Sequence, residues 1–114
     1  MRLLPEILAE RSTPGRVELE LRVPGDLEYF AGHFPGAPVL PGAVQLDWCV
    51  RLGRERLALR GGFRAAEQIK FLAPIGPEAR VTLLLELKAS GERLDFRYFS
   101  QAKKLSSGTF VFGA

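Results

Sequence analysis

A segment rich in proline and glycine, PGDLEYFAGHFPGAPVLP at residues 24–41, constrains the fold of this chain more than any other feature. It holds four prolines and three glycines in eighteen residues. Proline fixes one backbone dihedral and removes an N–H donor, so neither a long helix nor a central strand can run through the segment. We therefore predict a structured loop. Pro41 suits the first turn of a helix, and residues 42–59 contain no further proline, so one helix should follow directly.

This helix changes character along its length. Its first half, AVQLDWCV, is apolar nearly all round, which predicts that it is buried. Its second half, RLGRERLAL, is amphipathic and basic. Gly61 and Gly62 are expected to end it.

The remaining segments are typical of strands. Apolar and charged residues alternate in RVELELRV at residues 16–23, which predicts a half-buried strand, and residues 7–11 are an earlier strand candidate before a turn at residues 12–15. Four further candidates are residues 63–72, 79–89, 93–100 and 106–112, separated by turn signals at Pro74–Pro77, Ser90-Gly91 and Lys103-Lys104. Short connections predict that these neighbours pair antiparallel. At 114 residues the chain is one domain, an α+β fold in which an antiparallel sheet of five or six strands wraps a central helix.

Composition narrows the class of function. No apolar run approaches the roughly 20 residues of a membrane-spanning helix, and MRLLPEILAER has no apolar core of a signal peptide, so we expect a cytoplasmic protein without a membrane partner. One cysteine and one histidine cannot build a disulfide or a structural zinc site, and we expect no metal. A net charge of +3 is too small to indicate nucleic-acid binding.

His33 is the single imidazole in the chain, so a general base of that type must be this residue. It lies in the rigid loop between Gly32 and Phe34, where one side-chain orientation can be held. The alternative is a histidine without a catalytic role, which packs against its neighbours or lies at the surface.

Asp47 interrupts the apolar half of the helix, and burial of an unpaired carboxylate is costly. One interpretation is an i,i+4 pair with Arg51 on an exposed stripe. The other is a desolvated carboxylic acid with a raised pKa that donates a proton.

The helix start, Pro41-Gly42-Ala43, is a third candidate. First-turn amides have no internal acceptor, so they can stabilise a carbonyl that develops negative charge, and Gly42 lets a substrate approach closely. A base, an acid and an amide site without a nucleophile fit proton abstraction alpha to a thioester carbonyl and loss of a beta hydroxyl.

Cys49 is interpreted as structural, since no sequence feature makes it a thiolate.

The segment GHFPGAPVLPGAVQLD closely resembles the active-site segment of bacterial 3-hydroxyacyl-acyl carrier protein (ACP) dehydratases, which have the hot-dog fold. The family pattern is G-H-F-x-G-x-P-V-x-P-G, with an acidic residue fourteen positions after the histidine, as His33 and Asp47 are spaced here. Similarity extends to LEYFAGHF and to IKFLAPIGP, and residues 1–10 are matched least.

The resemblance implies that His33 removes the alpha proton, Asp47 protonates the departing hydroxyl and the Gly42 amide polarises the thioester carbonyl. It also implies a homodimer, with higher oligomers left open, in which the histidine of one subunit faces the acid of the other. The reaction would convert (3R)-3-hydroxyacyl-ACP to trans-2-enoyl-ACP without a cofactor, the substrate being carried on the phosphopantetheine of ACP.

The acid and the length of the chain point to different branches of this family. Aspartate is typical of the branch that also isomerises the double bond, whereas the general dehydratases have glutamate, yet that isomerising branch is considerably longer than 114 residues. Short dehydratases of aryl polyene pathways resemble the chain better in size; fatty acid synthesis is the other pathway.

An acyl tunnel between subunits is expected, and the residues expected to line it are Phe34, Leu40, Pro41, Val44 and Trp48. For each of them the alternative is ordinary core. Basic residues in the second half of the helix have two interpretations. They stabilise the negative end of the helix dipole, or they form a docking surface for the acidic carrier protein. The docking candidates are Arg51, Arg54, Arg64 and Lys70, with Arg56, Arg60, Lys103 and Lys104 as further contributors.

Two other functions compete with dehydration. A hot-dog thioesterase would use the acid to activate water. A non-catalytic partner subunit would bind ACP or stabilise an active homologue, although such a subunit has no need to keep His33 and Asp47.

Overall fold

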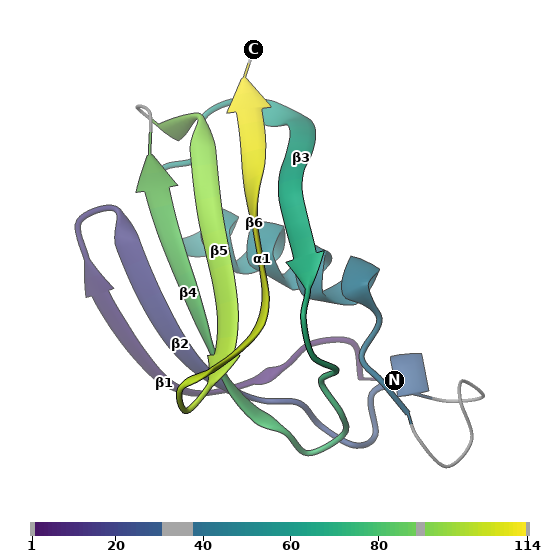
Figure 1. The fold of residues 1–114 in the computed structure, drawn as a ribbon. Helices are drawn as coiled ribbons and strands as arrows, with labels where there is room; N and C mark the ends of the chain where they lie inside the picture. The colour runs from purple at the N-terminus through teal and green to yellow at the C-terminus, as the bar shows by residue number, and fades with distance from the viewer. Residues whose placement is uncertain (1, 31–37, 89–90, 114) are drawn as a thin grey trace.

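The computed structural model describes residues 2–30, 38–88 and 91–113. One helix lies against one face of a six-stranded antiparallel sheet (Figure 1). The elements in chain order are β1 (Glu6–Thr13), β2 (Arg16–Arg22), a 3-10 turn η1 (Glu28–Phe30), α1 (Gly42–Arg56), β3 (Gly62–Phe71), β4 (Arg80–Lys88), β5 (Arg93–Ser100) and β6 (Lys103–Gly113). The α+β prediction with a sheet around a central helix is confirmed.

The strand order is β1-β2-β4-β5-β6-β3, so every pairing is antiparallel but not every sequence neighbour is a sheet neighbour. The prediction that the two strands after the helix, β3 and β4, pair with each other was wrong. β4 pairs with β2, and β3 pairs with β6 at the far edge. The connection between β3 and β4 therefore crosses the sheet. A short connection between two strands was not sufficient to predict that they pair with each other.

The core follows from the alternation along β2 and β4. Val17 and Leu19 lie opposite Leu85 and Leu83 in register, and all four are buried. Trp48 and the other buried residues of α1 complete this layer on the helix side. The apolar face of the sheet and the helix thus protect each other from water.

Helix α1 begins where Pro41 predicts but ends at Arg56, before Gly61 and Gly62. Leu57 has an extended backbone conformation, and the Arg60 N–H donates to the Gly91 carbonyl at 2.9 Å. This contact joins the segment after the helix to the connection between β4 and β5, two interior strands of the sheet. Gly61 adopts a φ of +79°, which begins the turn into β3 rather than ending the helix.

The last turn also differs from expectation. Lys103 and Lys104 were predicted to form a turn, but they are the first residues of β6. The turn lies at Gln101-Ala102, where Gln101 has a φ of 53°. The two lysines extend a strand whose apolar residues begin only at Leu105, so the alternating pattern did not reveal its start.

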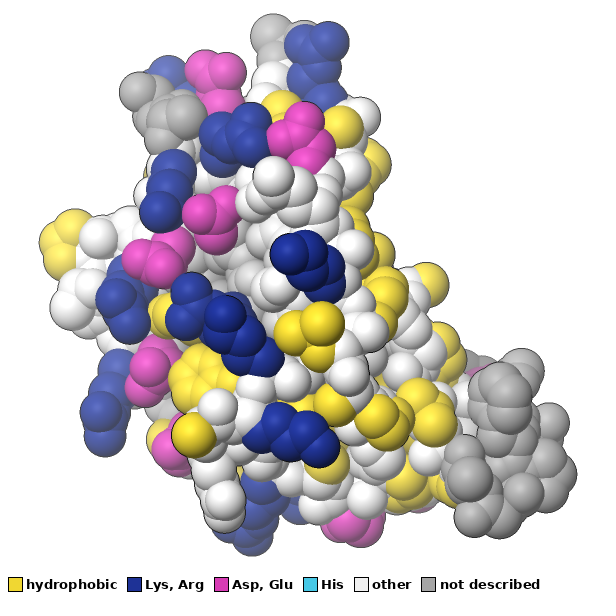
Figure 2. All heavy atoms as spheres, viewed as in Figure 1, with side chains coloured by type: hydrophobic (Ala, Val, Ile, Leu, Met, Phe, Trp, Pro, Cys, Tyr) yellow, Lys and Arg dark blue, Asp and Glu magenta, His cyan; other side chains and the backbone are white. Residues whose placement is uncertain are grey.

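Both edge strands, β1 and β3, are largely exposed to solvent. Figure 2 shows hydrophobic side chains gathered along the flank where β3 lies in Figure 1. Phe63, Phe71 and Leu72, on and just after β3, are each more than half exposed. An uncovered apolar edge strand is a surface on which another strand can pair.

Candidate functional site

The start of α1 opens into a cavity of about 250 Å³. Pro41 is the N-cap residue and no side chain caps the helix, so its first amides lack a side-chain acceptor. The ring of Phe71 lies over Gly42 so closely that a Cβ at this position would be 2.5 Å from Cζ. The residues that line the cavity are Val39, Leu40, Gly42, Gln45, Phe71, Leu72, Ala73 and Pro74. A side chain at position 42 would therefore displace the Phe71 ring.

Asp47 lies in a second cavity, of about 450 Å³. Its lining residues are Arg2, Leu3, Leu4, Pro5, Tyr29, Asp47 and Arg51. The expectation of a buried acid is wrong for the single chain: the Asp47 side chain is 52% exposed and pairs with Arg51 at 3.5 Å. The i,i+4 interpretation is the one that the geometry bears out.

Among the residues that the structure describes, none lines both cavities. Asp47 is five residues beyond Gly42, which in an α-helix corresponds to a rotation of about 140° and a rise of about 7.5 Å. The Gly42 amide and the Asp47 carboxyl of one chain therefore face different spaces, and a small substrate bound at one does not meet the other.

His33 and Phe34 lie outside the described residues. The residues on either side of this part of the chain are informative, because Tyr29 lines the cavity of Asp47 and Leu40 lines the cavity of Gly42. One described flank of the histidine therefore contributes to the cavity of Asp47 and the other to the cavity of Gly42.

The predicted tunnel residues divide between cavity and core. Leu40 lines the cavity beside Gly42, and Pro41 is half-buried directly before the helix. Val44 and Trp48 are core residues in this chain. The Trp48 indole N–H donates to the Leu3 carbonyl at 3.0 Å, which fastens the N-terminal segment along the Asp47 cavity.

A buried polar group that sequence reasoning missed lies one turn into α1. The Gln45 amide Nε2 donates to the Leu40 carbonyl at 3.3 Å, and its Oε1 accepts a 2.7 Å hydrogen bond from the Ser106 hydroxyl. The Tyr98 hydroxyl donates to the Gln45 backbone carbonyl at 2.7 Å, and the Cys49 thiol donates to that hydroxyl at 3.6 Å. The available signal was a glutamine within a run that was otherwise apolar up to Asp47.

Burial raises the pKa of the Cys49 thiol and also the pKa of the Tyr98 hydroxyl. Both groups therefore stay protonated near neutral pH. Cys49 is a packing residue with a weak hydrogen bond rather than a nucleophile, as the sequence indicated.

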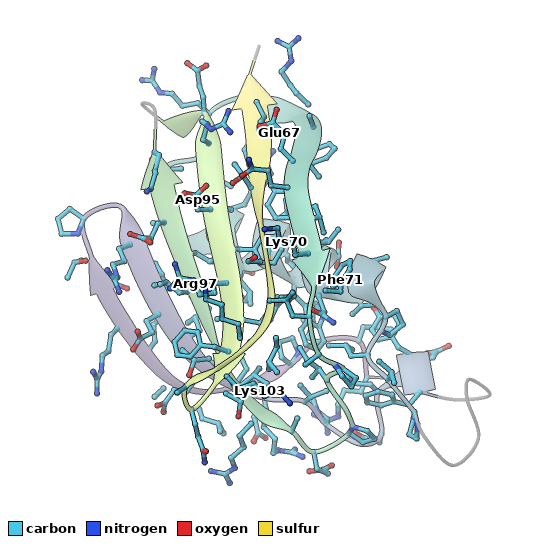
Figure 3. The ribbon with its side chains drawn as sticks, viewed as in Figure 1. Glu67, Lys70, Phe71, Asp95, Arg97 and Lys103 are labelled. Carbon is cyan, nitrogen blue, oxygen red and sulfur yellow. The ribbon has the colours of Figure 1, made fainter. Side chains whose placement is uncertain are left out.

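The basic residues expected to dock a carrier protein do not form one patch in the single chain. Arg51 pairs with Asp47, and Arg54, also on α1, donates to the Gly61 carbonyl and lies over the Phe112 ring. Lys70 lies in register with Ser107 and Arg97 on the opposite face of the sheet, which Figure 3 shows toward the viewer. Arg64, on β3, lines a third cavity, of about 500 Å³, together with Gly113.

Two kinds of feature are absent from the described ranges. No helix among residues 2–30, 38–88 and 91–113 is long and apolar enough to cross a bilayer. Within the same ranges no three His, Cys, Asp or Glu side chains gather as metal ligands would.

Solved structures with the same arrangement of sheet and helix place this chain among the hot-dog proteins of the dehydratase type. One of them, "The Dehydratase Heterocomplex ApeI:P" from Xenorhabdus doucetiae, matches with a TM-score of 0.85 and 27% identity, over 97% of each chain. An uncharacterized protein from Erwinia carotovora subsp. atroseptica matches with a TM-score of 0.82 and 37% identity, over 95% of this chain and 94% of that one.

The chain belongs to the ApeI-like family, described as ApeI dehydratase, whose model matches residues 9–109. The family resemblance drawn from the sequence is confirmed. A 3-hydroxyacyl-[acyl-carrier-protein] dehydratase FabZ from Erythrobacter litoralis is 36% identical over 76 residues, 59% of this chain and 50% of that protein. Its counterpart from Novosphingobium aromaticivorans is 30% identical over 101 residues, 81% of this chain and 64% of that protein. The chain thus spans less than two thirds of the length of these curated relatives.

Proposed function

We propose that this protein dehydrates (3R)-3-hydroxyacyl-ACP to trans-2-enoyl-ACP, in fatty acid or aryl polyene biosynthesis, at a site that two copies build together. One observation carries the proposal: Gly42 and Asp47 lie on one helix but open into separate cavities. A dehydratase needs a carbonyl-polarising donor, a base and an acid on one substrate, and two copies can supply them. Membership in the ApeI-like family supports the same reaction.

In this reaction the His33 imidazole of one copy takes the proton from C2 of the thioester. The Gly42 amide of the same copy donates to the carbonyl oxygen, where negative charge develops. Asp47 of the other copy gives its proton to the hydroxyl on C3, and the C3–O bond breaks to release water. The proton then held by His33 returns to the Asp47 carboxylate through solvent, so that atoms and charge balance without a cofactor.

Assembly would also change the environment of Asp47. A second chain over the exposed Asp47 side chain would remove water from the carboxyl, as the burial expected of a general acid requires. The exposed edge of β3, with Phe63 and Phe71, is the surface that supports this assembly. We propose a homodimer; because the Xenorhabdus structure is named as a heterocomplex, a related but different second chain is the alternative.

The carrier would be ACP, bound through cations near the mouth of the shared site. Arg51 is the candidate that the structure supports best, because it lines the Asp47 cavity and is itself half-exposed. Arg54, Arg64 and Lys70 stay candidates for docking from neighbouring surfaces.

The test is mass spectrometry of a 3-hydroxyacyl-ACP incubated with the wild-type protein, His33→Ala or Asp47→Asn. We expect the wild type alone to remove one water, and to act more weakly on the matching coenzyme A thioester, which lacks the acidic carrier. Release of the free acid would assign a thioesterase instead. No change at any chain length, with the folded protein present, would assign the non-catalytic partner.

A further inference from the structure

Gln45 is a buried polar side chain whose position needs a reason. It is 3% exposed, and its neighbours in the core are largely apolar. A primary amide in such a place costs free energy unless its oxygen and nitrogen are both hydrogen-bonded. Ser106 and the Leu40 carbonyl supply those bonds, so the amide joins three elements: the loop before the helix, α1 and β6.

These bonds act on the residues just before the Gly42 amide. The Leu40 N–H donates to the Ile75 carbonyl at 2.7 Å, and the Leu40 carbonyl accepts from Gln45 at 3.3 Å. Both backbone polar groups of Leu40 are therefore fixed by hydrogen bonds. Pro41 comes next and has no N–H, and no side chain caps the helix. The Gln45 side chain therefore holds the carbonyl that precedes Pro41 from inside the helix, while the first N–H groups of the helix keep no side-chain acceptor.

We infer that Gln45 is a positioning residue: with Ser106 it fixes the Leu40–Gly42 backbone against β6, so that the Gly42 amide faces the cavity beside it. This role rests on the proposed dehydration. Hydrogen-bond donors stabilise a developing oxyanion only when they are held in place before the reaction. Gln45 also lines that cavity, and both its amide oxygen and its amide nitrogen are already engaged within the chain.

The test separates positioning from stability with a double variant. Gln45→Leu alone leaves the Ser106 hydroxyl unpaired in the core, whereas Gln45→Leu with Ser106→Ala removes both side-chain partners and leaves only the Leu40 carbonyl without its donor. The matched control is Thr109→Val, which deletes a hydroxyl of the same strand that donates to Asp95 at 2.7 Å on the outer face. Thermal unfolding and steady-state kinetics with 3-hydroxyacyl-ACP are measured for each variant.

We expect the double variant to unfold within a few degrees of the wild type, to keep its KM and to lose about 10- to 100-fold in kcat. Thr109→Val should keep kcat even where its unfolding temperature falls. A double variant with wild-type kcat would overturn the positioning role and leave the dehydratase intact. A wild-type protein that removes no water would overturn the dehydratase proposal and this role with it.

Discussion

Asp47 shows what a sequence can and cannot predict about a single side chain. Its position within the apolar half of the helix selected it as a candidate, and its fourteen-residue spacing from His33 matched the family resemblance. Its burial was predicted wrongly, because an apolar pattern on a helix does not state whether a face is covered by the same chain or by another. In this chain Ala43 and Asp47 are exposed, whereas Val44 and Trp48 turn into the core.

Asp47→Asn should leave the stability of the isolated chain nearly unchanged while it removes the proposed activity. The carboxylate is half-exposed and its ion pair with Arg51 is a surface pair, worth under about 1 kcal/mol. Urea unfolding of Asp47→Asn beside Arg51→Gln checks this expectation. A loss above about 2 kcal/mol for Asp47→Asn would mean that the carboxylate has a structural role that its exposed position does not explain.

Gln45 marks the other limit of prediction at this scale. Its polarity within the apolar half of α1 was visible in the sequence, but its partner Ser106 is 61 positions away. Only the tertiary arrangement of α1 against β6 brings the two together. No local pattern could have identified the pair.

At the scale of elements, the strands were predicted closely and their neighbours were not. Period-two alternation depends on local residues, so β2, β4 and β5 lie within a residue or two of their predicted ranges. The order of the strands depends on contacts between residues far apart in the sequence. The crossing from β3 to β4 could therefore not be predicted from local patterns. The helix end was missed for the same reason, because Gly91 draws Arg60 away from the helix.

A carboxylate network that joins β1, β2 and the start of β4 should make the fold sensitive to acid. The Gly25 amide and the Arg22 guanidinium hold the pKa of Glu78 below its ordinary 4.5, and hydrogen bonding to Arg22 lowers the pKa of Glu6. A depressed folded-state pKa contributes stability that is present above pH 4.5 and is lost as the pH falls through the folded-state value.

Glu78→Gln should therefore weaken the dependence of stability on acid pH. The measurement is the urea midpoint between about pH 3 and pH 7 for Glu78→Gln, with Glu20→Gln, at an exposed residue of β2 outside this network, as the matched control. If the urea midpoints of the wild type and of Glu78→Gln fell equally as the pH decreased, the contribution of this network would be disproved.

At the scale of the whole molecule, the separation of the two cavities matters most. The family resemblance implied a shared site, and the different directions of Gly42 and Asp47 on α1 support that expectation. A sequence alone could suggest this from helix geometry, but only the tertiary structure shows that no described residue lines both cavities.

Two inactive variants should therefore restore each other when they are mixed. A dimer of His33→Ala with Asp47→Asn holds one site in which both residues are native, so random exchange should return about a quarter of wild-type activity. The measurement is the rate of water loss after the variants are unfolded and refolded together. Each variant refolded alone is the control. A mixture no more active than its components would mean that each chain completes its own site.

The indole hydrogen bond at the N-terminal segment has an optical consequence. Trp48 is the single tryptophan of the chain, it is fully buried, and its N–H is bonded to Leu3 in the wall of the Asp47 cavity. Its fluorescence is therefore a built-in reporter. A red shift of the emission would signal that residues 2–5 have lifted from the helix, even in experiments where no substrate is turned over.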